Sequence, residues 1–327
     1  MKILKITYLV IGCVAFLGLN LISCNEANKD NEERTTGDYI KNLQSANTSE
    51  HLEDVFFINP DTGWAVGDNG VILNTKDSGQ SWEIHPRDTT ARFFGVHFSD
   101  EKTGWVVGEN GNVLHTEDGG VNWTSRGYNI SERLLGVHAI NEKCWIVGFN
   151  GSILHSDDGG RNWEAQESGV NEHLDDVYFI SDEKGWVVGV DGLILFTDDG
   201  GDNWHQQSSN ASEVLWGVDF YNEDLGWTVG DNGIILHTND GGENWEKQQT
   251  GVSERLYQVS FGDENSGWAV GHDGIILHTN DGGENWNDKS IDITGFILGV
   301  HFPEKQQGWM VGTGGNIIKL TLEEEIL

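Results

Sequence analysis

The sequence predicts an all-β protein, a single seven-bladed β-propeller built from four-stranded blades. Three repeated units lead to this fold class. An apolar-x-x-Val-x-Phe unit recurs seven times, and a nine-residue motif such as HTNDGGENW recurs six times in register with it. A unit usually written Gly-Trp-x-Val-Gly recurs at nearly constant spacing, centred on Trp64, Trp105, Trp145, Trp186, Trp227, Trp268 and Trp309. A period of this length with several short strands is typical of a propeller blade.

Each repeat divides into four expected strands. The apolar-x-x-Val-x-Phe unit is the first strand and the tryptophan-centred unit is the second. A tight turn such as Asp68–Gly70 follows, where asparagine and glycine tolerate the positive φ that a short hairpin needs. A Val/Ile/Leu run is the third strand, and the tryptophan that ends the nine-residue motif opens the fourth. No helical period follows Cys24.

One repeat is shorter than the others. The step from Trp105 to Trp145 lacks a single position, and the stretch HAINEKCW replaces the longer HFSDEKTGW of the preceding repeat. The missing position falls between two expected strands, where we expect a loop.

The two ends of the repeat array complement each other. The last repeat has three strands but lacks the nine-residue motif and the fourth strand, whereas residues 41–52 align without a gap with residues 245–256. An N-terminal strand would therefore complete the C-terminal blade and close the ring within residues 38–327. The alternative, an open solenoid, would need polar capping repeats, which are not evident here.

The N-terminal segment that ends at Cys24 has the composition of an export signal. Two lysines precede an apolar run, and Leu21–Cys24 resembles the lipobox of bacterial lipoproteins. We therefore expect a signal peptide over residues 1–23, lipidation of Cys24 and a polar tether over residues 24–37. A retained membrane helix is disfavoured because the apolar run is short. We expect the protein to be exported and anchored by its lipid to a bacterial membrane. The outer membrane and the cell surface are two alternatives for this location.

Charge and cysteine content exclude some classes of function. The 327-residue chain has a formal net charge of −34, which disfavours binding to nucleic acid because phosphate contacts require basic side chains. After cleavage before Cys24 only Cys144 remains besides the lipidated residue, so no disulfide is expected in the mature chain.

The nine-residue motif resembles the Asp box, or bacterial neuraminidase repeat, Ser/Thr-x-Asp-x-Gly-x-x-Trp. Its short carboxylate is suited to accept backbone N–H groups of its own turn, while the tryptophan packs beneath. Six equivalent copies argue against a catalytic role, and one carboxylate per turn does not assemble the oxygens that Ca²⁺ requires. We expect structural roles for the six aspartates Asp77, Asp118, Asp158, Asp199, Asp240 and Asp281.

Seven blades, Asp boxes and a Gly-Trp-x-Val-Gly strand together resemble the photosystem II stability and assembly factor family of propellers. The resemblance covers the whole expected mature domain. It implies the propeller fold and a protein-binding role, since members in photosynthetic cells act as assembly chaperones. Many members in other bacteria are exported proteins without known function, and fold alone does not establish function.

One face of the expected ring carries a basic feature. The residue preceding each first strand is basic, or can become so, in five of seven repeats. These residues are His51, Arg92, Arg133, His173 and Arg255, with Val214 and Phe296 at the other two positions. Arginines here are suited to bind carboxylates of a protein or peptide partner. In the alternative interpretation each arginine pairs with the preceding acid, as with Glu132 or Glu254, and both interpretations remain open.

A second ring lies between Val and Phe of the first strands: Phe56, His97, His138, Tyr178, Asp219, Ser260 and His301. Histidine and aspartate are zinc ligands, but positions spread around a seven-fold axis do not converge on one ion. We expect these residues to line the channel, with no metal and no cofactor.

The expected function is that of a non-catalytic, lipid-anchored, monomeric scaffold that binds a protein or peptide partner and contacts membrane only through its lipid. The alternative is a sialidase-like glycoside hydrolase or a glycan-binding propeller, with Arg92, Arg133 and Arg255 imitating an arginine triad. Against this, the chain lacks an FRIP-type signature, sialidases have six blades, and no nucleophile pair or other catalytic residue can be assigned.

Overall fold

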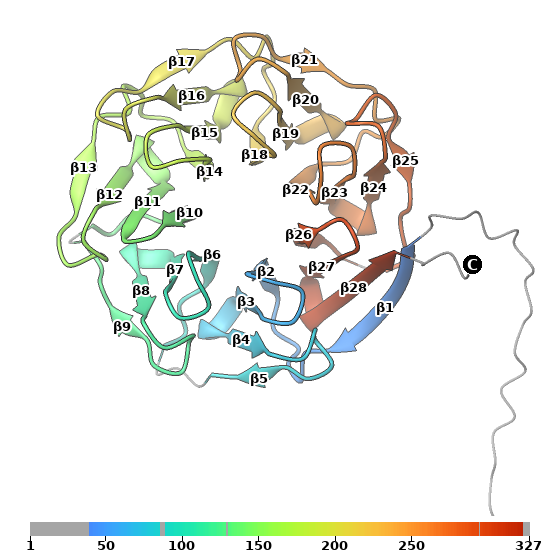
Figure 1. Ribbon diagram of the computed structural model, residues 1–327, viewed down its shortest axis with the longest axis horizontal. Coiled ribbons are helices and arrows are strands. Elements are labelled where there is room, and N and C mark those ends of the chain that lie inside the picture. Colours follow the sequence, from blue (N-terminus) through green and yellow to red (C-terminus); the bar gives the residue numbers. More distant parts are fainter. Residues whose placement is uncertain (1–38, 86–88, 129, 294, 323–327) are drawn as a thin grey trace, which may run out of the picture. The chain divides into compact units, whose positions relative to one another are not determined.

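The computed structural model describes residues 39–85, 89–128, 130–293 and 295–322. These residues form seven four-stranded antiparallel sheets arranged as blades around a central channel (Figure 1). The predicted fold class is confirmed. The expected signal peptide, Cys24 and the tether lie outside the described residues and stay predictions.

The strands follow the same order in every blade, from the channel outward. The first strands are β2 (Leu52–Phe57), β6 (Phe93–Phe98), β10 (Leu134–Ile140), β14 (Leu174–Phe179), β18 (Leu215–Phe220), β22 (Leu256–Phe261) and β26 (Ile297–Glu304). The second strands are β3 (Gly63–Gly67), β7 (Gly104–Gly108), β11 (Lys143–Gly148), β15 (Gly185–Gly189), β19 (Gly226–Gly230), β23 (Gly267–Gly271) and β27 (Gln307–Gly312).

The two outer positions complete each sheet. The third strands are β4 (Ile72–Thr75), β8 (Val113–Thr116), β12 (Ile153–Ser156), β16 (Ile194–Thr197), β20 (Ile235–Thr238), β24 (Ile276–Thr279) and β28 (Asn316–Leu322). The fourth strands are β5 (Glu83–Ile84), β9 (Thr124–Ser125), β13 (Glu164–Gln166), β17 (His205–Gln207), β21 (Glu246–Lys247), β25 (Asn287–Asp288) and β1 (Tyr39–Ser45).

The second-strand tryptophans join neighbouring blades. Trp64 of β3 stacks on Phe98 of the next blade with ring centroids 3.4 Å apart, and its Nε1 donates a hydrogen bond to Gly119 O at 3.2 Å. Trp309 and Phe57 repeat the stack at 3.5 Å between the last blade and the first. The Trp64 and Trp309 side chains are completely buried, so each contributes a large apolar surface to a blade interface.

One interface departs from this pattern because blade three carries Ala139 where the other blades carry phenylalanine. Trp105 there stacks on His115 at 4.0 Å and meets Trp163 edge-on at 5.7 Å. The same blade contains the shortened repeat. The position that this repeat lacks falls in the connection between β10 and β11, where Asn141 has φ 55°. The predicted place of the loop is therefore confirmed.

Each Asp box is a hydrogen-bonded turn on the outer part of a blade. In blade four, Asn203 N donates to Asp199 Oδ1 at 2.9 Å and Asn203 Nδ2 donates to Oδ2 at 2.8 Å. Thr197 Oγ1 also donates to Asp199 and accepts from Gly201 N. All six boxes repeat this arrangement, in which the carboxylate satisfies donors of its own turn.

A glutamine from the preceding blade holds each of four Asp boxes in place. Gln207 of β17 donates its Nε2 to Gly241 O at 3.0 Å and accepts Trp245 Nε1 on its Oε1 at 3.2 Å. Glutamine suits this position because its amide offers one acceptor and one donor side by side. Gln44 of β1 makes equivalent bonds to the first blade, so the closing strand also locks the next blade.

The ring is closed by β1, which pairs antiparallel with β28 from Tyr39 opposite Leu322 to Ser45 opposite Asn316. Figure 1 shows β1 in blue beside β28 in red. The Tyr39 ring meets Trp268 edge-on at 4.9 Å, and its hydroxyl donates to Lys305 O. The predicted completion of the C-terminal blade by an N-terminal strand is therefore confirmed.

Closure predicts different outcomes for two N-terminal deletions. Removing residues 25–36 leaves β1 intact, so the melting temperature should not change. Removing residues 25–48 deletes β1, exposes the edge of β28 and removes Gln44 from the first Asp box, so the protein should melt lower or aggregate. Thermal melts of both proteins check this, and equal curves would contradict a closing role for β1.

The Asp-box geometry predicts that Asp199→Ala destabilises the protein by about 1 kcal/mol, because three hydrogen bonds of the turn lose their acceptor. The adjacent exposed Asp198 is a matched control, and Asp198→Ala should leave the unfolding midpoint unchanged.

The effect of Asp199→Ala should also depend on pH. Hydrogen bonds from Asn203 lower the pKa of Asp199, so the stabilisation is present above the ordinary carboxylate pKa and is lost as pH falls below about 4. Denaturant titrations at neutral and acidic pH measure this difference. Equal destabilisation by both alanine variants would show that the turn does not depend on this carboxylate.

Candidate functional site

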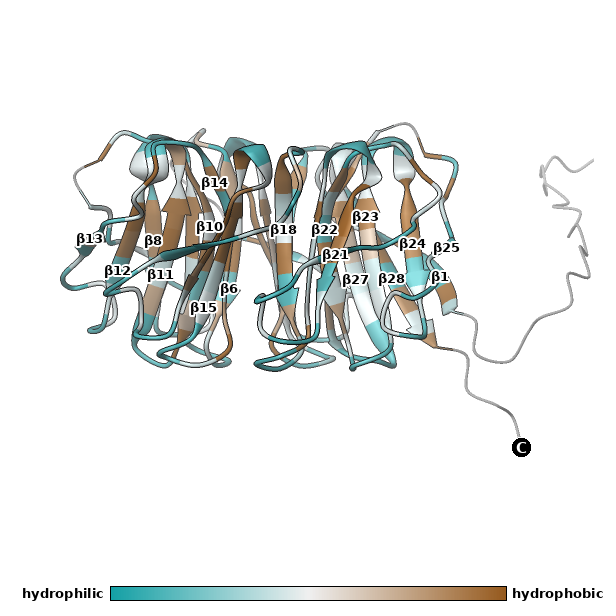
Figure 2. Cartoon of the chain, turned by 90° about the horizontal axis from the view of Figure 1, so that it is seen from above, coloured by the Kyte–Doolittle hydropathy of each residue, from teal (hydrophilic) through white to brown (hydrophobic). Residues whose placement is uncertain are grey.

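The blades present two different faces, and the candidate site lies at one of them. The turns between second and third strands lie next to the start of the first strands, since Asp68 N donates to His51 O at 2.9 Å. The Asp boxes lie at the opposite end, where Ser78 N donates to Asp61 O at 3.0 Å. Figure 2 shows hydrophobic colour along the strands and mostly hydrophilic colour at both ends.

The channel opens on the turn-bearing face into a cavity of about 610 Å³, which we call the mouth. Two sets of residues from successive positions form it. The pre-strand residues precede each first strand: His51, Arg92, Arg133, His173, Val214, Arg255 and Phe296. The mouth residues are the second residues of the first strands: Glu53, Phe94, Leu135, Asp175, Trp216, Tyr257 and Leu298. All of these except Arg255 line the cavity.

The three pre-strand arginines are held by acids of the preceding blade. Arg133 Nη2 lies 3.4 Å from Glu109 Oε1, and Arg255 Nε lies 2.5 Å from Asp231 Oδ1. Both acids occupy the first position of the turn between second and third strands, at the same distance along the chain from their arginine. The arginines remain between 40 % and 52 % exposed, so they are partly neutralised but reachable from solvent.

Arg92 is bound by two acids. Its Nε lies 3.1 Å from Oδ1 of Asp68, the equivalent turn acid, and its Nη2 lies 2.6 Å from Glu53 Oε1. Glu53 is only 10 % exposed. Burial raises the pKa of Glu53 above its usual value, although Arg92 opposes the shift. Arg92 therefore stabilises a buried carboxylate at the rim of the channel.

The arginines are ion-paired, as the alternative interpretation expects, but their partners are not the preceding acids. Glu132 and Glu254 instead accept the backbone N–H groups of Ser131 and Ser253, at 2.9 and 3.0 Å. The true partners were missed because each lies in the turn of the blade before its arginine. The regular spacing of these pairs becomes visible in the sequence only after the turn and the pre-strand residue are recognised as neighbours.

The same spacing places aromatic residues together where no ion pair forms. The ring of His173 stacks on that of Phe149 at 3.8 Å, and the ring of Phe296 lies 4.4 Å from that of His272. His51 Nδ1 lies 3.8 Å from Asp68 Oδ2. The structure thus brings four of the five predicted basic residues into the mouth lining and places Arg255 behind it, over the Trp216 ring at 4.6 Å.

The mouth residues were not singled out by sequence reasoning, although their common position in the first strand could have identified them. Five are apolar or aromatic and half-buried, which leaves an apolar rim open to solvent. The other two are Glu53 and Asp175. Burial and the neighbouring Asp176 raise the pKa of Asp175 to about 7, with Arg255 opposing the shift.

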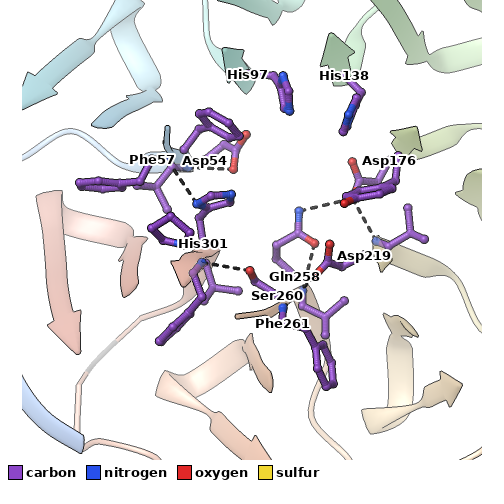
Figure 3. Close-up of a pocket in the computed structure, with 18 of the residues that line it drawn as sticks. Asp54, Phe57, His97, His138, Asp176, Asp219, Gln258, Ser260, Phe261 and His301 are labelled. Carbon is purple, nitrogen blue, oxygen red and sulfur yellow. Dashed lines mark hydrogen bonds between the residues drawn. The ribbon is translucent and has the colours of Figure 1, made fainter. Parts of the chain in front are cut away.

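Below the mouth, a cavity of about 410 Å³ fills the channel. Figure 3 shows its histidines and carboxylates arranged around the axis. Asp54, Asp176 and Gln258 line both cavities, so the two adjoin at this level. Gln258 reaches from β22 to Asp176 of β14, with Nε2 3.4 Å from Oδ2.

Several channel residues tie the first strands of adjacent blades together. Asp219 Oδ2 accepts Phe261 N at 2.7 Å, and Ser260 Oγ accepts Phe302 N at 3.0 Å. His301 Nδ1 accepts Phe57 N at 3.3 Å, which spans the closure between the last blade and the first. These side chains satisfy backbone donors that face a neighbouring blade without a backbone acceptor, so a structural role explains them.

The protonation states agree with this role. Burial lowers the pKa of His138 to about 3 and of His301 to about 4, so both are neutral at neutral pH and a ring nitrogen is free to accept. Burial raises the pKa of Asp54 and of Asp219 to about 7. Among the residues that the structure describes, no group of three or more His, Cys, Asp or Glu is placed to hold a metal ion.

Comparisons with known proteins agree with the propeller fold. A family model described as photosynthesis system II assembly factor YCF48 matches residues 36–136, 87–168, 161–250, 203–292 and 243–318. No curated protein sequence matches the chain.

Similar solved structures share the fold. YCF48 bound to D1 peptide is 24 % identical, with a TM-score of 0.75 over 89 % of this chain and 99 % of the other. YCF48 from Cyanidioschyzon merolae is 21 % identical, with a TM-score of 0.73 over 86 % and 98 %. Virginiamycin B lyase from Staphylococcus aureus is 15 % identical, with a TM-score of 0.76 over 88 % and 100 %. These TM-scores establish a common fold, and the family match over most of the chain establishes more: the protein belongs to the family of the photosynthesis system II assembly factor YCF48.

Proposed function

We propose that this protein is a non-catalytic, lipid-anchored, monomeric scaffold that binds a protein or peptide partner at the mouth, with contributions from His51, Arg92, Arg133, His173 and Arg255. The observation that carries the proposal is the mouth itself, a cavity of about 610 Å³ with a half-buried apolar rim and with the half-exposed Arg92 and Arg133 in its lining. Aromatic and arginine side chains of this kind contribute much of the affinity at protein interfaces.

A related propeller supports a peptide partner. YCF48 has been seen with a D1 peptide bound, and this chain shares its fold and family. Because the two sequences are only 24 % identical, the similarity supports the class of ligand, a peptide, and not the identity of that peptide. We therefore propose that the partner of this chain is a protein segment. The residues of the mouth indicate which side chains of that segment can bind there.

An enzymatic role has less support. The three arginines that would imitate a sialidase triad are each held by different acids, namely Asp68, Glu109 and Asp231. Sharing one substrate carboxylate would require all three to leave these partners. Virginiamycin B lyase shows that enzymes exist on this fold, but its 15 % identity carries no assignment of activity.

The anchor is proposed from the lipobox-like Leu21–Cys24. In the described parts of residues 39–322 there is no helix with the length and apolar character needed to cross a bilayer. Two acyl chains on one cysteine would hold the protein stably at a membrane, because each buried methylene contributes about 0.8 kcal/mol.

The mouth proposal predicts that Arg92→Gln, Arg133→Ala and Arg255→Ala together reduce recovery of the partner from solubilised membranes, measured by mass spectrometry. Glutamine at position 92 keeps an amide donor near the buried Glu53. The melting temperature should change little, because half-exposed ion pairs contribute no more than about 1 kcal/mol each. Added salt should weaken the wild-type complex more than that of the variant.

A matched control carries the same change of three charges on the opposite face: Lys143→Ala, Arg161→Ala and Lys184→Ala. These cations are also partly exposed and ion-paired, to Asp182, Glu142 and Glu223. Partner recovery should be retained in this control. If both triple variants recover the same proteins as the wild type, the mouth is not the binding site.

The anchor proposal predicts that Cys24→Ala abolishes incorporation of a fatty-acid probe and moves the protein from the membrane fraction to the soluble fraction. Cys13→Ala, in the expected signal peptide, serves as the control and should leave labelling unchanged. Undiminished labelling of Cys24→Ala would exclude this cysteine as the lipidated residue.

A further inference from the structure

The mouth contains a mismatched position. At three of the blade boundaries, the mouth residue of one blade contacts the pre-strand residue of the next blade. At the boundary between blades one and two, Glu53 binds Arg92. Between blades five and six, Arg255 lies over the Trp216 ring at 4.6 Å. Between blades six and seven, the rings of Tyr257 and Phe296 are 6.1 Å apart.

The boundary between blades four and five breaks this complementarity. Asp175 occupies the position of Glu53, and the pre-strand residue that corresponds to Arg92 is Val214. The turn residue that corresponds to Asp68 is Val190. Asp175 thus occupies the position of an acid that forms an ion pair, but Val214 occupies the position of its basic partner.

The carboxylate of Asp175 is correspondingly unsatisfied. Its Oδ2 is buried and receives no hydrogen bond from any residue that the structure describes. A buried carboxylate oxygen without a donor is costly, so an incoming donor would gain more here than at an exposed acid. The carboxylate lines the mouth together with Val190, Val214 and Trp216.

Arg255 does not supply the missing cation. Its Nε is bound to Asp231, and its guanidinium rests on the Trp216 ring. Trp216 Nε1 donates to the same Asp231 oxygen at 2.9 Å, so Asp231 holds the Arg255 and Trp216 side chains together. Arg255 thus influences Asp175 only through space.

The charges of the mouth also favour a cation. Arg92 is shared by Glu53 and Asp68, Arg133 is bound to Glu109, and Arg255 is bound to Asp231. Three guanidinium groups therefore face four carboxylates before Asp175 is counted. Asp54 and Asp176 also line the mouth, but they accept hydrogen bonds from Val96 N and Val218 N. Among the described acids of the mouth, Asp175 is the one with a buried oxygen that receives no hydrogen bond.

From this mismatch we infer that the mouth takes an arginine side chain of the partner, whose guanidinium binds Asp175 where Arg92 binds Glu53, and whose alkyl stem packs on Val190, Val214 and Trp216. The inference rests on the proposed function and specifies its ligand. A planar guanidinium suits the site because it donates two parallel hydrogen bonds to one carboxylate and stacks on aromatic rings.

Binding of such a ligand should depend on pH. The groups around Asp175 are Asp176 and His173 from its own blade, and Arg255 and Asp231 from the next two blades. With a pKa of about 7, Asp175 is mostly protonated at pH 6 and mostly charged at pH 8. A guanidinium prefers the charged form, so affinity should rise roughly tenfold over this interval.

The test uses the full-length protein and two peptides, acetyl-Gly-Gly-Arg-Gly-Gly-amide and the same peptide with citrulline, which is neutral but nearly isosteric. Binding is followed by the NMR shift of the Trp216 Nε1–H resonance, assigned with Trp216→Phe. We expect the arginine peptide to bind at least tenfold more tightly than the citrulline peptide, and its affinity to rise from pH 6 to pH 8.

Three variants make the test specific. Asp175→Asn should lower affinity for the arginine peptide about tenfold and remove its pH dependence, without lowering the melting temperature. Val214→Arg should place an arginine of the protein itself beside Asp175 and thereby abolish binding of the arginine peptide. Asp191→Asn is the matched control, because it removes one exposed carboxylate from the turn of the same blade at a positive φ that asparagine accepts. It should bind like the wild type.

Each other outcome has a definite meaning. Equal binding of the two peptides, or unchanged binding by Asp175→Asn, would overturn the arginine site. Absence of binding by both peptides would overturn it as well. If in any of these cases the triple arginine variant still loses the membrane partner, the scaffold function stands and only the identity of the ligand is wrong.

Discussion

The ring depends on the stack of a second-strand tryptophan against a phenylalanine of the next blade. A four-stranded blade has two apolar faces and cannot bury either one alone, so stability arises at the interfaces between blades. Trp64 against Phe98 and Trp309 against Phe57 show that the same contact serves both an internal interface and the closure. The Asp boxes and the bridging glutamines add polar bonds at the outer rim of these interfaces, and His301, Ser260 and Asp219 add others at the channel. The interface between blades five and six, for example, has such bonds on both sides of its apolar layer.

This arrangement separates structural positions from positions free to carry function. The second-strand tryptophans and the turn glycines recur in all seven repeats and the box aspartates in six, because the blades need the same contacts. The pre-strand and mouth residues differ from blade to blade, and their only shared requirement is to fit the neighbouring side chain. Where these residues contact one another, the pair is ionic, cation–π or aromatic, so equivalent positions accommodate side chains of different chemistry.

Much of the fold was accessible from sequence because the period repeats each constraint six or seven times. The register of Trp64 with Trp105, the Asp-box turns and the complementary ends all follow from aligning the chain with itself. The candidate site was less accessible. The basic pre-strand residues could be found, but Arg133 pairs with Glu109 rather than Glu132, and this depends on how adjacent blades are placed side by side. The burial that raises the pKa of Asp175 likewise arises from several blades together, and no local pattern in the sequence reports it.

The closing strand has a consequence for how the chain reaches its native state. Tyr39–Ser45 is made early in synthesis, but its pairing partner Asn316–Leu322 is made almost last. Contacts of such high sequence separation slow folding, and the six blades between them can assemble before the ring is sealed. During that interval the molecule has two complementary open edges, and β1 of one copy matches β28 of another in the same register. Intramolecular closure therefore competes with exchange of β1 between copies, so the balance between closed monomers and strand-swapped chains is set by protein concentration during folding.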